Sequence, residues 1–507
     1  MGAAGVARAG VGVGSESTLT PTDPAAIRFV LDGDVQVVDD IPATTTVLQY
    51  LREHLHRTGT KEGCAEGDCG ACTVVVAERV ADIVRYRTLN ACIQLLPTLD
   101  GKALLTVESL KKANGGGLHP AQQAMVECHG SQCGFCTPGF VMSLFALGRG
   151  NEAPSDDDIR FALAGNLCRC TGYRPILAAA RRMYELDGGV TEQYEQTLEA
   201  GLESVRVDRE KHLVSADCRY AAPVSLDGLA RLRSERPGAV LLAGGTDVGL
   251  WVTKEMRELA DIIYLGNVSG LDRIRHTSVC IEIGAAATLT DAFAALVAEY
   301  PDLDELVRRF ASPPICNAGT LCGNIANGSP IGDSMPALIC LGATLVLRKD
   351  GATRELPLED LYVGYRRTSL AAGEFVESVR VPRATPALAL RAYKVSKRYD
   401  QDISGVCAAF AVELVNGQIG RARVCVGAMA AVPKRASRCE AALSGAPWSA
   451  ATIEKAVQAL HADYQPITDL RASNDYRTRV AGNLLRRFHA DVSGTAEVTS
   501  VWDYAQS

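Results

Sequence analysis

The stretch KEGCAEGDCGACTVVV, residues 61–76, decides the fold of the first part of this chain. It sets the cysteines Cys64, Cys69 and Cys72 among the glycines Gly63, Gly67 and Gly70. Glycine accepts the backbone conformations of a tight loop, and such a loop can turn its amide groups toward sulfur atoms. The stretch therefore predicts a compact loop that presents several thiols on one side.

The spacing of these cysteines indicates what the loop holds. Cys64, Cys69 and Cys72 form a CxxxxCxxC pattern, and Cys92 follows at a distance. This is the ligand pattern of plant-type [2Fe-2S] ferredoxins, in which four thiolates surround two irons. A structural zinc site is the alternative, but zinc sites favour paired CxxC units. We therefore expect a [2Fe-2S] cluster on these four cysteines.

The segments before the loop fit a ferredoxin. Residues 27–38 read as two strands around Asp32-Gly33. They are followed by one apolar helical face, made of Val47, Leu48, Leu51 and Leu55. This order predicts a β-grasp [2Fe-2S] ferredoxin domain over residues 25–108.

A second group of cysteines follows in GSQCGFCTPGF and GNLCRCTGYRP, as a CxxC pair, Cys133 and Cys136, and a CxC pair, Cys168 and Cys170. Spacing alone leaves zinc as a competitor to an iron-sulfur cluster. The surrounding pattern predicts helices at 121–126, 140–147, 157–163 and 176–184. Four such helices would bring the two pairs together, so we expect a four-helix metal-binding domain over residues 109–186.

Composition limits the remaining possibilities. The 507 residues imply several domains. The net charge is -7 and no run of basic residues occurs, so the sequence does not favour binding to nucleic acid or to an anionic membrane. The sequence shows no signal peptide and no membrane-spanning segment, so we expect a soluble cytoplasmic protein. Because cytosolic thiols stay reduced, the 17 cysteines favour cofactor ligation over disulfides.

Two glycine-rich segments follow a polar linker at 187–212. VLLAGGTDVGL, residues 240–250, reads as a strand, a turn and a short helix, and a plain structural turn is an equal alternative for it. In the second, residues 310–338, glycines and polar residues fill what we expect to be one long loop before a helix. Neither contains the GxGxxG turn of a Rossmann fold. Backbone amides in such loops can cradle phosphates, so together the segments predict a nucleotide-binding domain.

At this point the resemblance to a family is specific. Residues 127–143 and 164–177, ECHGSQCGFCTPGFVMS and AGNLCRCTGYRPIL, resemble the second [2Fe-2S] domain of the molybdenum hydroxylases. In that family this cluster lies nearest the molybdenum centre, and the ferredoxin-type cluster lies between it and the flavin. The resemblance implies the same order here. Gln132 matches a position that contacts the pterin cofactor in the family.

The rest of the chain resembles the flavoprotein part of the xanthine dehydrogenase family. Residues 213–384 look like its PCMH-type FAD-binding α+β domain, shared with flavoenzymes of the vanillyl-alcohol oxidase type. Residues 385–507 resemble the CO-dehydrogenase-flavoprotein-like C-terminal α+β domain. Tyr365 matches a position near the nicotinamide site. The resemblance implies FAD contacts from Leu242, Ala243, Gly244, Gly245, Thr246, Asp247, Phe310, Thr320, Gly323, Asn324, Ser329, Asp333 and Lys394.

Two residues depart from the family pattern. Cys316 stands where arginine is common, and Cys322 replaces the first glycine of a usual pair. If position 322 required a positive φ, its Cβ would add about 1 kcal/mol of strain and weaken FAD binding. The sequence therefore puts the geometry of this loop in doubt.

The expected chain is thus a multi-domain α+β protein that follows a tail at 1–24. The resemblance, which is to the small subunit of bacterial xanthine dehydrogenases, implies that a separate large subunit binds molybdopterin and hydroxylates xanthine or hypoxanthine. Electrons would pass through both clusters to FAD and then NAD⁺, in a heterotetramer of two small and two large chains. No catalytic residue is assigned to this chain. The alternatives are the small subunit of another molybdenum hydroxylase, acting on an aldehyde or N-heterocycle, and a non-enzymatic redox-sensing electron carrier.

Overall fold

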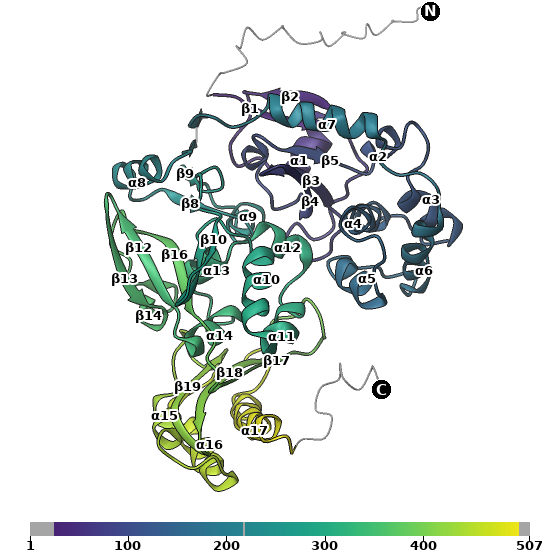
Figure 1. The fold of residues 1–507 in the computed structure, drawn as a ribbon. Helices are drawn as coiled ribbons and strands as arrows, with labels where there is room; N and C mark the ends of the chain where they lie inside the picture. The colour runs from purple at the N-terminus through teal and green to yellow at the C-terminus, as the bar shows by residue number, and fades with distance from the viewer. Residues whose placement is uncertain (1–24, 216–217, 496–507) are drawn as a thin grey trace, which may run out of the picture.

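The computed structural model describes residues 25–215 and 218–495 (Figure 1). The tail predicted at 1–24 and residues 496–507 of the predicted C-terminal domain lie outside the described residues. The expected multi-domain α+β architecture is confirmed, because the described residues form several separate sheets together with helices that pack on them. None of the helices in the described ranges is long and apolar enough to cross a membrane.

The first domain is a five-stranded β-grasp sheet in the order β2-β1-β5-β3-β4, with β1 and β5 parallel and the other pairs antiparallel. The two strands and the helical face predicted near the start are confirmed, although the helix soon becomes a π-helical turn, Tyr50–His54. The elements are β1 (Ile27–Leu31), β2 (Asp34–Val38), α1 (Val47–Gln49), β3 (Thr73–Val80), β4 (Ile83–Asn90) and β5 (Ala103–Leu105).

The second domain is helical, and all four predicted helices are confirmed. Its elements are α2 (Ser109–Ala113), α3 (Pro120–Glu127), α4 (Thr137–Gly150), α5 (Asp156–Leu163) and α6 (Arg174–Arg182). Successive side chains of a strand point to opposite faces of a sheet. Along β3, Val75 and Ala77 pack into a core shared with this helical domain, whereas Val74 and Val76 pack into a core shared with the next domain. The ferredoxin sheet is therefore held on both faces.

The segment predicted as a polar linker contains a helix, α7 (Glu192–Ser204). Tyr194, Leu198 and Leu202 are buried at four-residue spacing, which places them on one helical face. Gly201 passes so close to β1 that an added Cβ would lie 3.0 Å from Val30 Cγ2. The connection is thus packed on the ferredoxin domain along this helix.

The third domain contains two main sheets and a two-stranded one, formed by β14 and β15. The smaller main sheet has the order β6-β7-β9-β8, and the larger is antiparallel in the order β10-β11-β16-β12-β13. The first elements are β6 (Lys211–Val214), β7 (Arg219–Ala222), α8 (Leu226–Glu235), β8 (Val240–Leu242), α9 (Val248–Thr253), β9 (Asp261–Tyr264), β10 (Ile274–His276), β11 (Cys280–Gly284), α10 (Leu289–Glu299) and α11 (Asp304–Arg308). They are followed by α12 (Pro313–Ala318), α13 (Leu321–Asn327), α14 (Ser334–Leu341), β12 (Thr344–Lys349), β13 (Ala352–Pro357), β14 (Tyr362–Gly364), β15 (Arg367–Thr368) and β16 (Phe375–Pro382).

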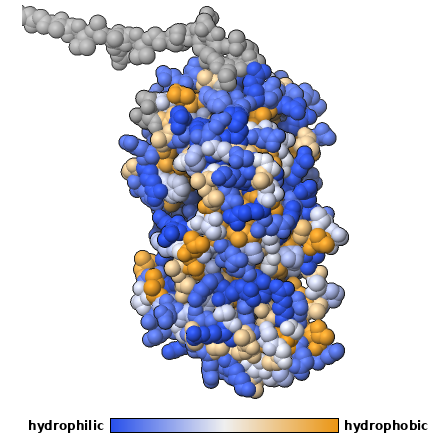
Figure 2. Space-filling model, turned by 90° about the vertical axis from the view of Figure 1, so that its left-hand side faces the viewer, coloured by the Kyte–Doolittle hydropathy of each residue, from blue (hydrophilic) through white to orange (hydrophobic). Residues whose placement is uncertain are grey.

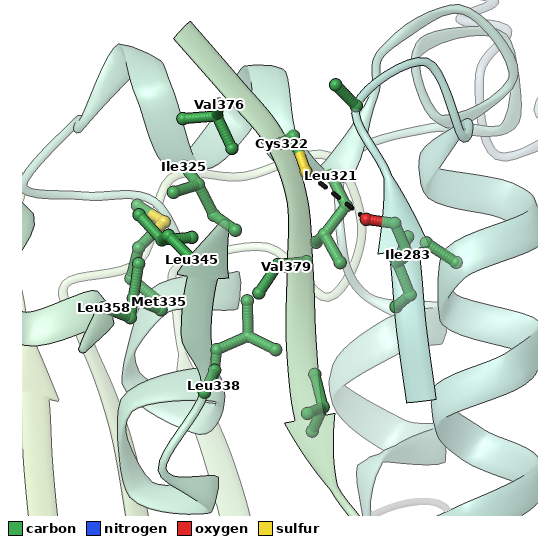
Figure 3. Close-up of a cluster of buried hydrophobic side chains, with 14 of the residues drawn as sticks. Ile283, Leu321, Cys322, Ile325, Met335, Leu338, Leu345, Leu358, Val376 and Val379 are labelled. Atoms are coloured by element: carbon green, nitrogen blue, oxygen red, sulfur yellow. Dashed lines mark hydrogen bonds between the residues drawn. The ribbon is translucent and has the colours of Figure 1, made fainter. Parts of the chain in front are cut away.

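The prediction of one long loop over residues 310–338 is wrong, because this segment forms α12, α13 and the start of α14. Prolines open α12, the Thr320 side chain caps α13 by accepting from the Gly323 amide, and Gly328 ends α13 in a left-handed conformation. Cys322 is helical, with its thiol donating to the Ile283 carbonyl at 3.7 Å inside an apolar core (Figure 3). The strain considered for a positive φ at position 322 does not arise.

The fourth domain is a three-stranded sheet with helices against one face, and the strands predicted after Ala387 are confirmed. Along β18, Ala408, Phe410 and Val412 pack against these helices, and the alternate residues pack toward α14 and the third domain. The elements are β17 (Leu388–Val395), β18 (Val406–Val415), β19 (Gln418–Gly427), α15 (Ser437–Leu443), α16 (Ala450–Asp463) and α17 (Asn474–Ser493).

The face on the side of α8 and β13 is mostly hydrophilic, with small separate groups of apolar residues (Figure 2). Scattered apolar residues are usual on surfaces that meet water.

Candidate functional site

The first four predicted cysteines meet at the edge of the ferredoxin sheet. Cys64, Cys69 and Cys72 lie in the loop before β3, and Cys92 lies in the turn after β4. The thiols of Cys69 and Cys92 donate to Cys64 and lower its pKa, whereas the same contact raises the pKa of both donors. Cys92 is also hydrogen bonded to Cys72. The side chains therefore form one connected group of sulfurs.

The backbone of the loop turns toward sulfur as predicted. Cys64 Sγ accepts from the amides of Glu66, Asp68 and Cys69 at 3.5, 3.4 and 3.3 Å. Gly67 takes a φ of +78°, and an added Cβ on Gly63 would lie 2.8 Å from Cys69 Sγ. Amides aimed at a sulfur stabilise a thiolate ligand and help to set a cluster's potential. The donor set and its cradle fit a [2Fe-2S] cluster.

The second four cysteines also meet, at the surface of the helical domain. Cys170 Sγ lies 3.7 Å from Cys133 Sγ and 3.9 Å from Cys168 Sγ, and Cys136 is hydrogen bonded to Cys168. Burial raises the pKa of Cys168, but hydrogen bonds with Thr171, Cys170 and Cys136 together outweigh it and bring the pKa to about 7. Within 25–215 and 218–495, no group of three or more His, Cys, Asp or Glu residues that could hold one metal ion is found, whereas a [2Fe-2S] cluster divides its four thiolates between two irons.

This second site also fits a [2Fe-2S] cluster, because its four thiols contact one another in a row and four cysteine thiolates are the ligands of such a cluster. Cys133 and Cys170 are exposed, as is Gln132. The exposed apolar side chains Phe135, Leu167 and Tyr173 stand beside these residues in the sequence.

A buried asparagine joins the two cysteine groups. Asn166 Nδ2 donates to the Gly70 carbonyl and to Thr73 Oγ1, both at 3.1 Å, and its Oδ1 accepts from Ser143 Oγ at 2.6 Å. The neighbouring Leu167 amide donates to the Cys69 carbonyl at 3.0 Å. An added Cβ on Gly70 would lie 2.1 Å from the Gly165 carbonyl oxygen, so the two loops are in direct contact. Sequence reasoning missed Asn166, although its position two residues before Cys168 is a signal that could have found it.

The loop of the first cysteine group also touches the third domain. Thr253 Oγ1, at the end of α9, donates to the Ala65 carbonyl at 2.8 Å, and Lys254 lies 3.8 Å from Glu66. An added Cβ on Gly249 would lie 2.3 Å from the carbonyl oxygen of Ile93, the residue after Cys92. The first group therefore lies between the surface group and the third domain.

The two predicted flavin-binding segments lie side by side. An added Cβ on Gly244 would lie 1.8 Å from the Ala318 carbonyl oxygen, so only glycine fits there. Asn327 Nδ2 donates to Asp247 Oδ1 at 3.0 Å, and burial raises the pKa of Asp247. This close approach fits the expectation of one nucleotide site built from both segments.

The other predicted flavin contacts spread over a wider region. Ser334 Oγ donates to Asn324 Oδ1 at 2.5 Å, and Lys394 Nζ lies 2.5 Å from Asp333 Oδ2 in a buried ion pair. Asp333 Oδ1 is buried without a hydrogen-bond partner, which leaves an acceptor free for a ligand.

A cavity of about 390 Å³ between the first and third domains is lined by three of the predicted flavin residues, Ala243, Gly244 and Thr320. The structure does not bring the other predicted contacts to its wall. Phe310 packs edge-on against Phe293, with ring centroids 4.9 Å apart, and Tyr365 is 58% exposed.

Four family models match the chain in order. Residues 29–93 match the 2Fe-2S iron-sulfur cluster binding domain, and residues 106–181 match the [2Fe-2S] binding domain. Residues 215–384 match the FAD binding domain in molybdopterin dehydrogenase, and residues 391–492 match the CO dehydrogenase flavoprotein C-terminal domain.

Curated relatives resemble nearly the whole chain. The xanthine dehydrogenase of Emericella nidulans is 32% identical over 94% of this chain and 39% of its own length. The xanthine dehydrogenase/oxidase of Gallus gallus is 30% identical over 85% of this chain and 37% of its own length. The chain thus spans less than two fifths of these relatives.

Solved structures resemble about half of the chain. A cyanide-inactivated Cu,Mo-CO dehydrogenase chain is 26% identical, with a TM-score of 0.50 over 54% of this chain and 97% of its own. A quinoline 2-oxidoreductase chain from Pseudomonas putida 86 is 25% identical, with a TM-score of 0.50 over 55% of this chain and 98% of its own.

Proposed function

The chain belongs to the molybdenum hydroxylase family, whose two [2Fe-2S] domains and FAD domain it carries, and from this premise we propose that it is the electron-carrying small subunit of a xanthine dehydrogenase. One observation carries the proposal: the eight cysteines form two groups in sequence between an exposed surface and the flavin-type domain. Such an order suits electron transfer in single steps.

In this proposal, Cys133, Cys136, Cys168 and Cys170 hold the outer cluster, and Cys64, Cys69, Cys72 and Cys92 hold the inner one. Bound clusters pass single electrons, and bound FAD collects two electrons and delivers a hydride to NAD⁺. The chain's own task is to hold these groups at fixed separations and to tune them. The amides that donate to Cys64 help to set the reduction potential of the inner cluster. Asn166 helps to fix the distance between the two clusters.

The same arrangement supports a molybdopterin-binding partner. Cys133, Cys170 and Gln132 are exposed, so a second protein can approach the outer cluster directly. The exposed Phe135 and Tyr173 would give such a partner apolar contact area. We propose a large subunit that carries the molybdenum cofactor and the purine site, in a heterotetramer of two small and two large chains.

Xanthine or hypoxanthine is the proposed substrate because the curated relatives named above are xanthine dehydrogenases. A second candidate is an N-heterocycle such as quinoline, because a quinoline 2-oxidoreductase chain is among the solved structures with a similar fold. Steady-state assays of the complex with xanthine, quinoline and an aldehyde separate these candidates. Turnover of quinoline without turnover of xanthine would reject the purine assignment.

The first test of the electron route needs only the purified, iron-replete chain. Anaerobic titration with NADH, followed by flavin and iron-sulfur absorbance, should bleach both signals. Bound flavin that NADH does not bleach would overturn the role of NAD⁺. Bleaching of flavin with unchanged cluster absorbance would overturn the proposed connection between the flavin and the clusters.

A further inference from the structure

Arg87 crosses the boundary between the ferredoxin domain and the flavin-type domain. It lies on β4, and its side chain is only 13% exposed. Its guanidinium donates to Thr288 Oγ1, at the N-cap of α10, at 2.8 Å and to Asp291 Oδ2, in the first turn of this helix, at 2.6 Å. The planar guanidinium can serve two such acceptors with fixed geometry. The contact therefore fixes direction as well as distance.

The next residue of β4 makes a second contact across the same boundary. Asn317 Nδ2, in α12, donates to both the carbonyl and the hydroxyl oxygen of Thr88, at 3.1 Å each. Asn317 Oδ1 accepts from Thr290 Oγ1 at 2.8 Å, which joins α12 to α10. We call Arg87, Thr88, Thr288, Asp291 and Asn317 the β4 latch.

On one side, the β4 latch leads to the predicted flavin segment. Thr288 forms a β-bridge with Thr320, and the Leu289 amide donates to the Gly319 carbonyl at 2.7 Å. The Leu321 amide returns a bond to the Ala287 carbonyl at 3.3 Å. A shift of α10 relative to the ferredoxin domain would therefore move the segment that begins α13.

On the other side, the β4 latch leads to the inner cysteine group. Three residues after Arg87, Asn90 Nδ2 donates to the Gly67 carbonyl at 2.7 Å. The Ala91 amide donates to the Cys72 carbonyl at 3.2 Å, and Cys92 follows directly. One short strand end thus carries both the contact to the third domain and the cysteine loop.

Apolar packing is interrupted beside the β4 latch. The cavity of about 390 Å³ between the two domains is lined by Arg87, Thr288, Asp291, Asn317 and Thr320. Close packing is what ordinarily prevents small shifts between parts of a protein. Where a cavity replaces it, the hydrogen bonds that cross the gap supplement the apolar core that the two domains share elsewhere.

We propose that Arg87 is a positioning residue that sets the separation and orientation of the inner cluster relative to the flavin. This inference rests on the proposed function, because it concerns the electron step between these two groups. In that step the reduced cluster is oxidised by one electron and the flavin is reduced by the same electron. Arg87 takes no part in the chemistry and acts through Thr288 and the segment bonded to it.

The test uses the purified chain loaded with iron-sulfur clusters and FAD. A brief radiolytic pulse reduces a small fraction of the centres, and absorbance follows the electron as it equilibrates between cluster and flavin, without NADH or a molybdenum partner. Arg87→Gln should slow this equilibration several-fold, because the rate of electron transfer falls steeply as the donor and the acceptor move apart. Iron, FAD content and reduction potentials should remain those of the wild type.

Arg85→Gln is the matched control. Arg85 lies on the same strand and lines the same cavity, but it is 42% exposed and lies 3.7 Å from Asp291. Its loss should change the rate by less than about twofold, since exposed pairs contribute little. Arg87→Lys, which keeps the charge without the planar donor pair, should recover only part of the rate. Hydrogen exchange of residues 287–291 and 319–323 should be faster in Arg87→Gln than in Arg85→Gln.

The outcomes separate the inference from the proposed function. If Arg87→Gln equilibrates as fast as wild type, the positioning role of Arg87 is overturned and the proposed function stands. If the wild type shows no exchange between cluster and flavin, both are overturned. If Arg87→Gln loses FAD or fails to fold, Asp291→Asn decides instead: slower equilibration supports the β4 latch, and an unchanged rate overturns it.

Discussion

Asn166 is the residue whose removal most directly tests how the two iron-sulfur domains are held together. Asn166→Ala deletes three hydrogen bonds, to Gly70, Thr73 and Ser143, from a side chain that is 3% exposed. It introduces no bulk and leaves every cysteine in place. The change therefore isolates the contact between the two loops.

The magnitude follows from the bonds lost. At about 1 kcal/mol for each buried hydrogen bond, Asn166→Ala should lower the local free energy of opening by about 3 kcal/mol. Since about 1.4 kcal/mol is a factor of ten, amides that exchange through this opening should exchange on the order of a hundredfold faster. The effect should concentrate in β3 and α4, whose residues Thr73 and Ser143 lose their partner.

Hydrogen exchange with mass spectrometry measures this segment by segment, which suits a chain of several domains. Asn151→Ala is the control, because Asn151 accepts one exposed bond, from the Ala153 amide at 3.0 Å. It should shift local stability by less than about 0.5 kcal/mol. Equal exchange of β3 and α4 in Asn166→Ala, Asn151→Ala and wild type would refute the reasoning.

Three further predictions concern single side chains. Burial and, to a smaller extent, the nearby Arg149 lower the pKa of His119 from 6.5 to about 4. Between these pH values the unfolded state therefore binds more protons than the folded state, so the free energy of unfolding should fall as the pH drops from about 6.5 to about 4. His119→Asn, which can still cap α3, should flatten this slope in urea titrations at each pH, and an unchanged slope would assign it to other groups. Cys322→Gly should cost about 1 to 2 kcal/mol of stability, through helix propensity and a small cavity, without tighter FAD binding in fluorescence titrations; tighter binding would show that the Cys322 side chain opposes the flavin. Cys170→Ser should remove about half of the bound iron while the inner cluster's spectrum persists, and loss of zinc in place of iron would identify the outer site as a zinc site.

The cysteine groups could be predicted from the sequence because ligand spacing is local chemistry. A CxxxxCxxC loop and a CxxC/CxC pair place thiols together through a few residues of backbone each, and the structure brings each set of four into contact. The four helices around Cys133 were equally readable, since their apolar periodicity is long enough to be seen.

The segment from 310 to 338 was misread because its helices are short. α12 and α13 have 6 and 7 residues, too few for a periodic pattern to outweigh the signal of glycine, asparagine and proline. Only the cap at Thr320 marks α13 as a helix in the sequence. Helix α7 was missed for a different reason. Tyr194, Leu198 and Leu202 have the four-residue spacing of a helical face, but the charged residues around them favoured the interpretation as a polar linker.

The contacts between domains could not be predicted from the sequence. Nothing near Arg87 in the chain points to Asp291, and nothing near Asn166 points to Gly70, because these pairs are made by packing of separate domains. The same holds for Lys394 and Asp333, which come from different domains. Their partners depend on the shape of the assembled molecule and not on local propensity.

The packing of α7 bears on whether the connecting segment is needed to hold the two halves of the molecule together. Lys211 Nζ, just after this segment, donates to the Ala26 carbonyl at 2.9 Å, and Gly201 lies against Val30, so the connection is fastened to the first strand of the chain. A protease that cut the backbone after α7 would release neither half, because the ferredoxin sheet also shares a core with β7 and β9. Peptide continuity is therefore dispensable for keeping the iron-sulfur half beside the flavin half, and a nicked protein would migrate as two bands in denaturing gels while remaining one particle in solution.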